Sequence, residues 1–214
     1  MSGSRSDRAP CNAPRAVIFD VGGTIVRVNV ALALASTGGG SGQTAQKIWS
    51  ALEADPLWND WQEGKILPRE WHLHVAQKFG WTLGFEAFRD AWNRVLEPET
   101  IIPDELFRKL ARRCHLALLS NTDPIHVAHM EANFSFVRFC PVRVYSCELG
   151  ARKPAQEIYL RALTELGVAA GDAMYIDDIE EFVQAARAVG MRGVQFTSVS
   201  ALESELRATG LLID

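Results

Sequence analysis

The amino-acid sequence predicts an α/β protein with a Rossmann-like parallel sheet core and an inserted α-helical cap domain. Three short apolar runs each end on polar residues, namely Asp20, Ser120 and the pair Asp177 and Asp178. After Asn121 the apolar runs alternate with helical patterns, which is typical of a parallel sheet. Asp20 and Ser120 are a hundred residues apart, far more than a simple crossover needs, so we expect an insertion between them.

The first strand is expected at residues 16–19, a β-branched apolar run followed by Asp20 and then by Gly22 and Gly23. This places Asp20 at the carboxyl end of a buried strand, beside exposed main-chain N–H groups. In an open α/β sheet, ligands bind at that end of the strands. A carboxylate there can serve as a nucleophile, a metal ligand or both. By itself, Asp before Gly-Gly is equally compatible with an ordinary turn.

The inserted segment contains all six tryptophans and has a helical pattern. Helices are expected there at 43–54, 68–79 and 85–96. Most of the tryptophans are expected to form the core of these helices, whereas Trp58 and Trp61 flank a polar stretch and are candidates for substrate contacts. Segment 37–42 is rich in glycine but lacks the Gly-Lys-Ser/Thr of a P-loop, so we expect a flexible joint. The predicted domains are a disordered tail (1–14), a core (15–29 and 98–214) and the cap (30–97).

Downstream of Asn121 the expected elements alternate regularly. Helices are predicted at 124–133, 154–166, 180–189 and 199–209, and strands at 142–146, 173–177 and 193–196. Gly190 is expected to end one of these helices. Lys153 lies in a loop just before a helix. Because parallel strands end at one edge of a sheet, we expect the polar residues that follow them to gather there.

Some polar residues are assigned structural roles. His126 and His129 are spaced as neighbours on a helix, and because no third ligand is evident we assign them to a solvated helix face. The four cysteines form no C-x-x-C pair and are predicted to be reduced thiols; they are Cys11, Cys114, Cys140 and Cys147. Cys147 lies near the candidate site and is interpreted as a packing residue.

The composition excludes several classes of protein. The chain has 22 Lys and Arg against 26 Asp and Glu, a formal net charge of −4, and no basic stripe, so no nucleic-acid partner is expected. No apolar stretch approaches the roughly 18 residues of a transmembrane helix. The first fourteen residues lack the apolar region of a secretory signal. We therefore expect a cytoplasmic protein without a membrane partner, either a monomer or a homodimer.

Four segments together resemble the motifs of the haloacid dehalogenase-like hydrolase superfamily, most of whose members are phosphatases. They are FDVGGTI, LSNTD, GARKPAQEIY and YIDDIEEFVQAARAVGM, and the resemblance extends from about Arg15 to the end of the chain. It implies a Mg²⁺-dependent phosphatase that acts on a small phosphorylated metabolite through an aspartyl-phosphate. It also implies that the inserted helices are the small cap that this family places after its first motif.

The resemblance assigns a role to each matching residue. Asp20 would attack phosphorus, and Ser120 and Lys153 would be the other catalytic residues. The residues expected to hold the phosphate are Val21, Gly22, Ser120, Asn121 and Lys153. The expected Mg²⁺ ligands are Asp20, the Gly22 carbonyl and Asp178, with Asp177 acting through water. A cation among these acids would relieve their mutual repulsion.

Two positions depart from the family pattern. Many phosphatases of the family carry an acid/base aspartate where this chain has Gly22, which is also a candidate for a positive φ. Phe182 stands where many relatives have an Asp or Asn that supports the metal. Two alternatives therefore stay open. One is a 2-haloacid dehalogenase, in which Asp20 displaces halide without a metal. The other is a catalytically impaired relative that binds a phosphorylated ligand or a protein partner.

Overall fold

The computed structural model describes residues 13–34 and 44–212. The predictions for residues 1–12, for segment 37–42 and for Cys11 lie outside this part of the chain. Cys114, Cys140 and Cys147 are free thiols, as the sequence predicts. In the described residues, every helix is too short or too polar to cross a lipid bilayer.

A five-stranded parallel sheet forms the centre of the molecule. Its strands are β1 (Ala16–Phe19), β4 (His115–Ser120), β5 (Val142–Tyr145), β6 (Ala173–Asp177) and β7 (Arg192–Gln195). Their order is β5-β4-β1-β6-β7, and every neighbouring pair is parallel. The chain moves outward from β1 to one side through β4 and β5, and to the other side through β6 and β7. The carboxyl ends of β1 and β6 therefore meet at the point where strand order reverses, and the predicted fold class is confirmed.

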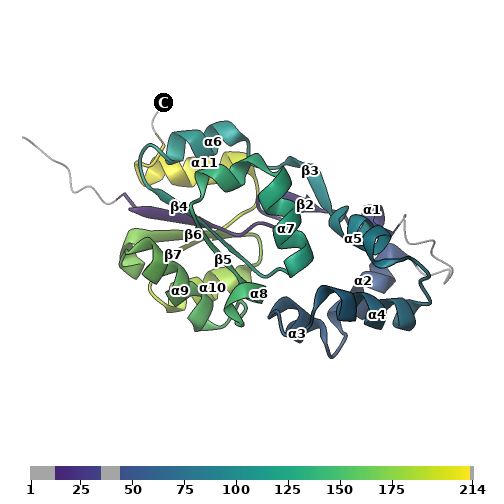
Figure 1. Cartoon of the computed structure of the whole chain (residues 1–214). Coiled ribbons are helices and arrows are strands. Elements are labelled where there is room, and N and C mark those ends of the chain that lie inside the picture. The colour runs from purple at the N-terminus through teal and green to yellow at the C-terminus, as the bar shows by residue number, and fades with distance from the viewer. Residues whose placement is uncertain (1–12, 35–43, 213–214) are drawn as a thin grey trace, which may run out of the picture.

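Helices cover both faces of this sheet (Figure 1). One face carries α6 (Asp104–Leu110), α7 (Pro124–Asn133) and α11 (Val199–Ala208), and the other carries α9 (Gln156–Leu166) and α10 (Glu180–Ala188). Alternate residues of β1 point to the two faces, because Val17 and Phe19 join the first hydrophobic cluster and Ile18 joins the second. Three short helical segments complete this body: η1 (Ser135–Phe139), α8 (Ser146–Leu149) and η2 (Ala170–Asp172).

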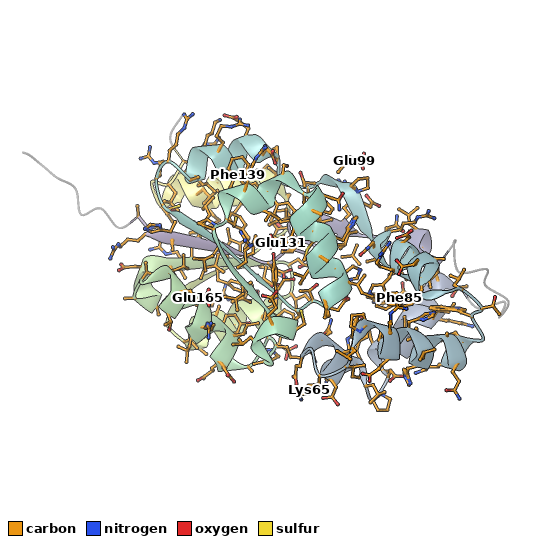
Figure 2. All side chains as sticks on the ribbon, in the orientation of Figure 1. Lys65, Phe85, Glu99, Glu131, Phe139 and Glu165 are labelled. Atoms are coloured by element: carbon orange, nitrogen blue, oxygen red, sulfur yellow. The ribbon has the colours of Figure 1, made fainter. Side chains whose placement is uncertain are left out.

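Between β2 (Val26–Val28) and β3 (Leu96–Thr100), the described residues form five helices, which lie as a separate group beside the sheet (Figure 1). They are α1 (Val30–Leu34), α2 (Ala45–Glu53), α3 (Trp58–Gln62), α4 (Pro68–Phe79) and α5 (Phe85–Asn93). Their hydrophobic core contains five buried tryptophans, and the sixth, Trp49, packs against it half-buried. The tryptophans thus serve mainly as the core of these helices, as predicted. Figure 2 shows Lys65 and Phe85 on this group, and Glu131, Phe139 and Glu165 on the sheet body.

Two antiparallel strands, β2 (Val26–Val28) and β3 (Leu96–Thr100), lead into and out of the inserted helices. The prediction of one helix over 85–96 was wrong at its end, because α5 stops at Asn93 and Leu96 begins β3. Pro98 lies within β3, which is tolerated because this two-stranded sheet has only edge strands. The boundaries proposed for the cap, 30 and 97, stay a prediction.

The other predicted helices and strands are present, with ends shifted by one or two residues. Gly190 follows α10 with φ of 93°, a left-handed conformation that glycine adopts without strain. The sequence analysis missed the short elements α1, α3, α6 and α8, and both strands of the antiparallel pair. These segments have three to seven residues, too few for hydrophobic periodicity to identify them.

Asp55 is a buried carboxylate that joins α2 and α4. It accepts hydrogen bonds from Lys78, from His74 Nε2 at 2.9 Å and from the Leu57 main-chain N–H at 2.9 Å. Burial alone would raise the pKa of Asp55, but the hydrogen bonds from Lys78 and His74 outweigh it and hold the pKa at about 2. Because this folded-state pKa is depressed, the stabilisation is complete above the unfolded-state pKa of about 3.8 and is lost as the pH falls toward 2.

We predict that Asp55→Asn lowers the free energy of unfolding by about 1–3 kcal/mol at pH 7, because it removes charged hydrogen bonds to a buried group. The difference from wild type should shrink as the pH falls from about 4 toward 2. Urea unfolding of both proteins across this range measures it. Asp90→Asn, which affects only an exposed pair with Arg89, is the control and should change little. If the difference in the free energy of unfolding did not change with pH, the assignment of a low pKa to Asp55 would be contradicted.

Candidate active site

A buried lysine joins two buried carboxylates at the carboxyl edge of the sheet. Lys153 Nζ lies 2.7 Å from Asp20 Oδ1 and 2.7 Å from Asp177 Oδ2. The residues Lys153, Asp20 and Asp177 are 1 %, 5 % and 0 % exposed. Asp20 follows β1 and Asp177 ends β6, and the pairing of Phe19 with Ile176 sets these acids side by side. Charges buried this deeply are stable only when paired, so the three groups depend on one another.

Aromatic side chains surround the lysine. Lys153 Nζ lies 4.8 Å from the centre of the Phe182 ring and 5.8 Å from that of Tyr175. The Tyr175 hydroxyl also donates a hydrogen bond to Asp177 Oδ2. Phe182, where relatives were expected to carry a polar residue, thus forms a cation–π contact with the lysine.

Both oxygens of Asp177 are already bound within the protein. Oδ2 accepts from Lys153 and Tyr175, and Oδ1 accepts from the Ile179 main-chain N–H at 2.8 Å. The Asp178 side chain is more available to bind a cation. Among the described residues, it accepts one weak hydrogen bond, from Thr24 at 3.3 Å. It packs directly against Gly23, whose φ is +83° and where any Cβ would collide with the Asp178 carboxylate. Gly23 therefore has to be glycine, for reasons of both space and conformation.

Carboxylate oxygens of Asp20, Asp177 and Asp178 all lie within 4.8 Å of one another. Burial and the nearby Asp177 raise the pKa of Asp20 to about 7, although Lys153 opposes the shift. Burial and Asp177 also raise the pKa of Asp178. Burial alone would lower the pKa of Lys153, but Asp20 and Asp177 outweigh it and raise the pKa. Three acids around one lysine leave excess negative charge, and an all-oxygen donor set with this charge fits Mg²⁺.

The segment after β4 holds the lysine loop in place. Ser120 ends β4 and is buried. The Asn121 side chain accepts from the Lys153 main-chain N–H at 2.7 Å and donates to the Lys153 carbonyl at 3.0 Å. Asn121, predicted as a phosphate-binding residue, thus uses its side chain to fix Lys153. Val21 and Gly22 lie in the turn after Asp20, where Gly22 forms an isolated bridge with Val26.

A cavity of about 110 Å³ lies beside this edge of the sheet, between the motif segments and the inserted helices. Gly22, Ser120 and Asn121 line it, together with Trp49 and Trp58 from the insert. The prediction for Trp58 as a cleft residue therefore agrees with its position. The one for Trp61 was wrong, because Trp61 is fully buried and stacks on Trp71 with ring centres 5.4 Å apart. Trp49 lines the cavity instead.

A second buried pair, which the sequence analysis missed, lines the same cavity. His126 Nδ1 lies 2.8 Å from Asp123 Oδ2, and His126 Nε2 lies 3.0 Å from the Trp92 carbonyl. The assignment of His126 to a solvated helix face was wrong, since it is 8 % exposed. Burial alone would lower the pKa of His126, but Asp123 outweighs it and raises the pKa. Asp123 before Pro124 has the pattern of a helix start, and Asp123 and His126 are spaced by three, which indicates the pair.

The family of the chain follows from comparison with known proteins. The family model of the haloacid dehalogenase-like hydrolases matches residues 14–190, and the chain belongs to this family. It is 27% identical over 202 residues to sesquiterpene phosphatase astK of Aspergillus oryzae, covering 92% of this chain and 97% of that protein. It is 22% identical to D-ribitol-5-phosphate phosphatase of Bacteroides thetaiotaomicron, covering 84% of this chain and 90% of that one. The predicted enzyme class, a hydrolase of a family with phosphatases among its members, is confirmed.

A solved structure also matches the fold. It is a HAD family enzyme of Bacteroides thetaiotaomicron in complex with magnesium and inorganic phosphate. The two chains superpose with a TM-score of 0.74 at 22% identity, over 87% of this chain and 96% of that one. At this identity the similarity supports the fold and does not transfer the ligands.

We predict that Lys153→Met lowers the free energy of unfolding by about 3–5 kcal/mol in EDTA, because Asp20 and Asp177 lose their buried partner. The double variant Lys153→Met, Asp177→Asn should recover part of this loss, since it removes one of the two unpaired charges. Urea unfolding measures both effects. Lys65→Met, which removes an exposed lysine paired with Asp60 and Glu63, is the control. Equal losses for the two single variants would contradict the buried arrangement.

Proposed function

We propose that this protein is a Mg²⁺-dependent phosphatase that hydrolyses a small phosphorylated molecule through an aspartyl-phosphate on Asp20. The observation that carries the proposal is the position of Lys153 Nζ between Asp20 and Asp177, with Asp178 adjacent. Such a set combines a nucleophile, a fixed cation and a cation-binding group of carboxylates. Phosphoryl transfer depends mainly on positioning and on charge neutralisation of this kind.

Each residue has a distinct part in the proposed reaction. An Asp20 oxygen attacks phosphorus, the bond to the leaving alcohol breaks, and water later attacks the aspartyl-phosphate. Lys153 holds Asp20 in place and offsets charge on the phosphoryl oxygens. We assign the binding of those oxygens to Ser120 and to the main-chain N–H groups of residues 21, 22 and 121, which belong to segments that line the cavity. Asn121 contributes further by fixing Lys153.

The proposed Mg²⁺ ligands are Asp20, the Gly22 carbonyl and Asp178. When bound, Mg²⁺ supplies positive charge that lowers the repulsion between Asp20 and the incoming phosphate. Asp177 is assigned an indirect role, through water and through Lys153, because both of its oxygens already accept hydrogen bonds.

The haloacid dehalogenase alternative fits these groups less well. Displacement of halide by Asp20 needs no metal, so it gives no use for the crowded carboxylates of Asp177 and Asp178. The relatives named above act on substrates as different as a sesquiterpene phosphate and ribitol phosphate, going by their names. The relationship therefore supports phosphate-ester hydrolysis and leaves the alcohol part open. The cytoplasmic location and the monomeric or dimeric state also stay predictions.

The proposal is tested with p-nitrophenyl phosphate, a phosphate ester with a good leaving group. We predict that wild type hydrolyses it with Mg²⁺ and loses this activity in EDTA, and that Asp20→Asn abolishes it because the amide is no nucleophile. Asp172→Asn is the control and should retain wild-type turnover, because Asp172 precedes β6 at the opposite end of that strand from Asp177 and its side chain, 46% exposed, pairs with Arg15. Full activity in EDTA would overturn the metal role, and halide release from 2-chloropropionate would then support the dehalogenase.

Gly22 makes a further prediction possible. The expectation of a positive φ at Gly22 was wrong, since Gly23 has it. A Cβ at position 22 would lie 3.2 Å from Val28 Cγ2, so Gly22→Asp requires only a small shift of that side chain. We predict that Gly22→Asp raises turnover of alkyl phosphates, at most by the roughly 10²–10⁴-fold that general acid catalysis gives. Turnover of p-nitrophenyl phosphate should change little, because its leaving group needs no proton.

Steady-state kinetics on both substrates measure this difference. Gly22→Ala is the matched control, because it introduces the same Cβ without a carboxylate. If the folded aspartate variant leaves both rates unchanged, another group supplies the proton. If wild type and variant hydrolyse no phosphate at all, the catalytically impaired alternative is supported instead.

A further inference from the structure

The 110 Å³ cavity next to the motif segments has an uneven chemical lining. Toward the sheet edge it is lined by Gly22, Ser120 and Asn121, which the proposed function assigns to the phosphate. The insert, the antiparallel strands and the segment with α7 contribute more apolar and aromatic residues than the four polar ones, which are Gln62, Thr122, Asp123 and His126. The apolar residues are Val28, Trp49, Trp58, Val95, Leu96 and Met130.

The apolar part begins immediately beside the first motif. Val28 Cγ2 lies 3.2 Å from the position that a Cβ of Gly22 would occupy, so an apolar methyl group takes the space next to the turn. Trp49 and Trp58 meet edge to face, with ring centres 5.6 Å apart. Trp49 and Val95 also line a second, small apolar space inside the insert.

Most polar side chains of the cavity are already engaged with other parts of the protein. Asn121 binds the main chain of Lys153, and Asp123 and His126 bind each other and Trp92. Gln62 has a buried side-chain oxygen to which no described residue donates a hydrogen bond. This oxygen and the hydroxyls of Ser120 and Thr122 offer a ligand few hydrogen-bond partners. A chain of several hydroxyl groups would lose its hydration here without replacement, which is unfavourable.

We propose that the alcohol part of the phosphorylated substrate is a hydrocarbon chain or ring that lies against Val28, Trp49 and Trp58. This inference rests on the proposed function, since it needs the phosphate to bind at Gly22 and Ser120. It adds the substrate class: an apolar alcohol phosphate is favoured over a sugar or polyol phosphate. Burial of the hydrocarbon against aromatic rings supplies the selective part of the binding energy.

The test uses alkylphosphonates, whose carbon–phosphorus bond resists hydrolysis. Isothermal titration calorimetry in Mg²⁺ gives the dissociation constants of methyl-, propyl-, butyl- and hexylphosphonate. Because the phosphonate group is constant, the series isolates the effect of chain length. We expect binding to tighten roughly two- to fourfold with each added methylene until the cavity is full. Propylphosphonate should bind more tightly than its 2,3-dihydroxy derivative, which has the same chain length with two hydroxyls.

Two variants locate the effect. Val28→Asn places an amide in the apolar part at a side chain that is 44 % exposed, so folding should survive the change. It should weaken hexylphosphonate binding several-fold and leave methylphosphonate binding unchanged. Leu73→Asn is the matched control, because Leu73 lies on α4 outside the cavity lining and is 66 % exposed. It should bind the whole series like wild type.

Several outcomes would overturn the inference: affinities that do not depend on chain length, equal or tighter binding of the dihydroxy derivative, or no binding of any phosphonate. An equal loss of hexylphosphonate affinity in Val28→Asn and Leu73→Asn would also overturn the inference. Binding is measured without turnover, so these outcomes are separate from failure of the proposed function. Inactivity on p-nitrophenyl phosphate with a normal chain-length dependence would reject catalysis while keeping the apolar site.

Discussion

The buried contact of Lys153 with Asp20 and Asp177 is the interaction on which the site depends. A lysine with 1 % exposure is stable only while both carboxylates stay within hydrogen-bonding distance. That requirement fixes the register of β1 against β6, since a slip of one residue would turn either acid to the opposite face of the sheet. It also explains why Asn121 holds the main chain of the lysine loop from both sides. The register of β1 against β6 and the Asn121 hydrogen bonds thus both keep the charged Lys153 side chain in position.

Each of the three residues after Ser120 binds a different segment of the chain, so the contacts that hold Lys153 continue toward the inserted helices. Asn121 binds the Lys153 loop, the Thr122 N–H donates to Ser146 Oγ at 2.9 Å, and Asp123 accepts from Trp92 Nε1 at 3.0 Å. Ser146 in turn donates to the Gln62 carbonyl of the insert at 2.7 Å. The inserted helices are therefore attached to the segment that directly follows Ser120, the serine that we propose to bind phosphate. Their position over the cavity and the geometry of the site are determined together.

The parts of the site at strand ends were predictable from the sequence, and those that need contacts between distant segments were not. Asp20, Ser120 and Asp177 each follow an apolar run, and alternating strands and helices place such positions at one edge. His126 was misjudged because its partner Trp92 is 34 residues away, and nothing in the local pattern indicates that contact. The prediction of Trp61 as a substrate contact was wrong for the same reason, and the position of Trp49 at the cavity was not predicted. Both lie on helical segments, and only the packing of α3 against α4 buries Trp61.

The two departures from the family pattern have a common electrostatic consequence. With Gly22, the cluster contains Asp20, Asp177 and Asp178 against one lysine. Burial and the charge of Asp177 already raise the pKa of Asp20 and of Asp178, and a further acid would add to that repulsion. Phe182 likewise adds a ring beside Lys153 where a polar group was expected. Next to Gly22, a Val28 methyl group lies 3.2 Å from where a Cβ at position 22 would be, so it would have to shift slightly for a longer side chain. None of Gly22, Val28 and Phe182 adds a charge to this group of side chains. The apolar lining that begins at Val28, beside Gly22, is therefore consistent with the hydrocarbon substrate that we propose.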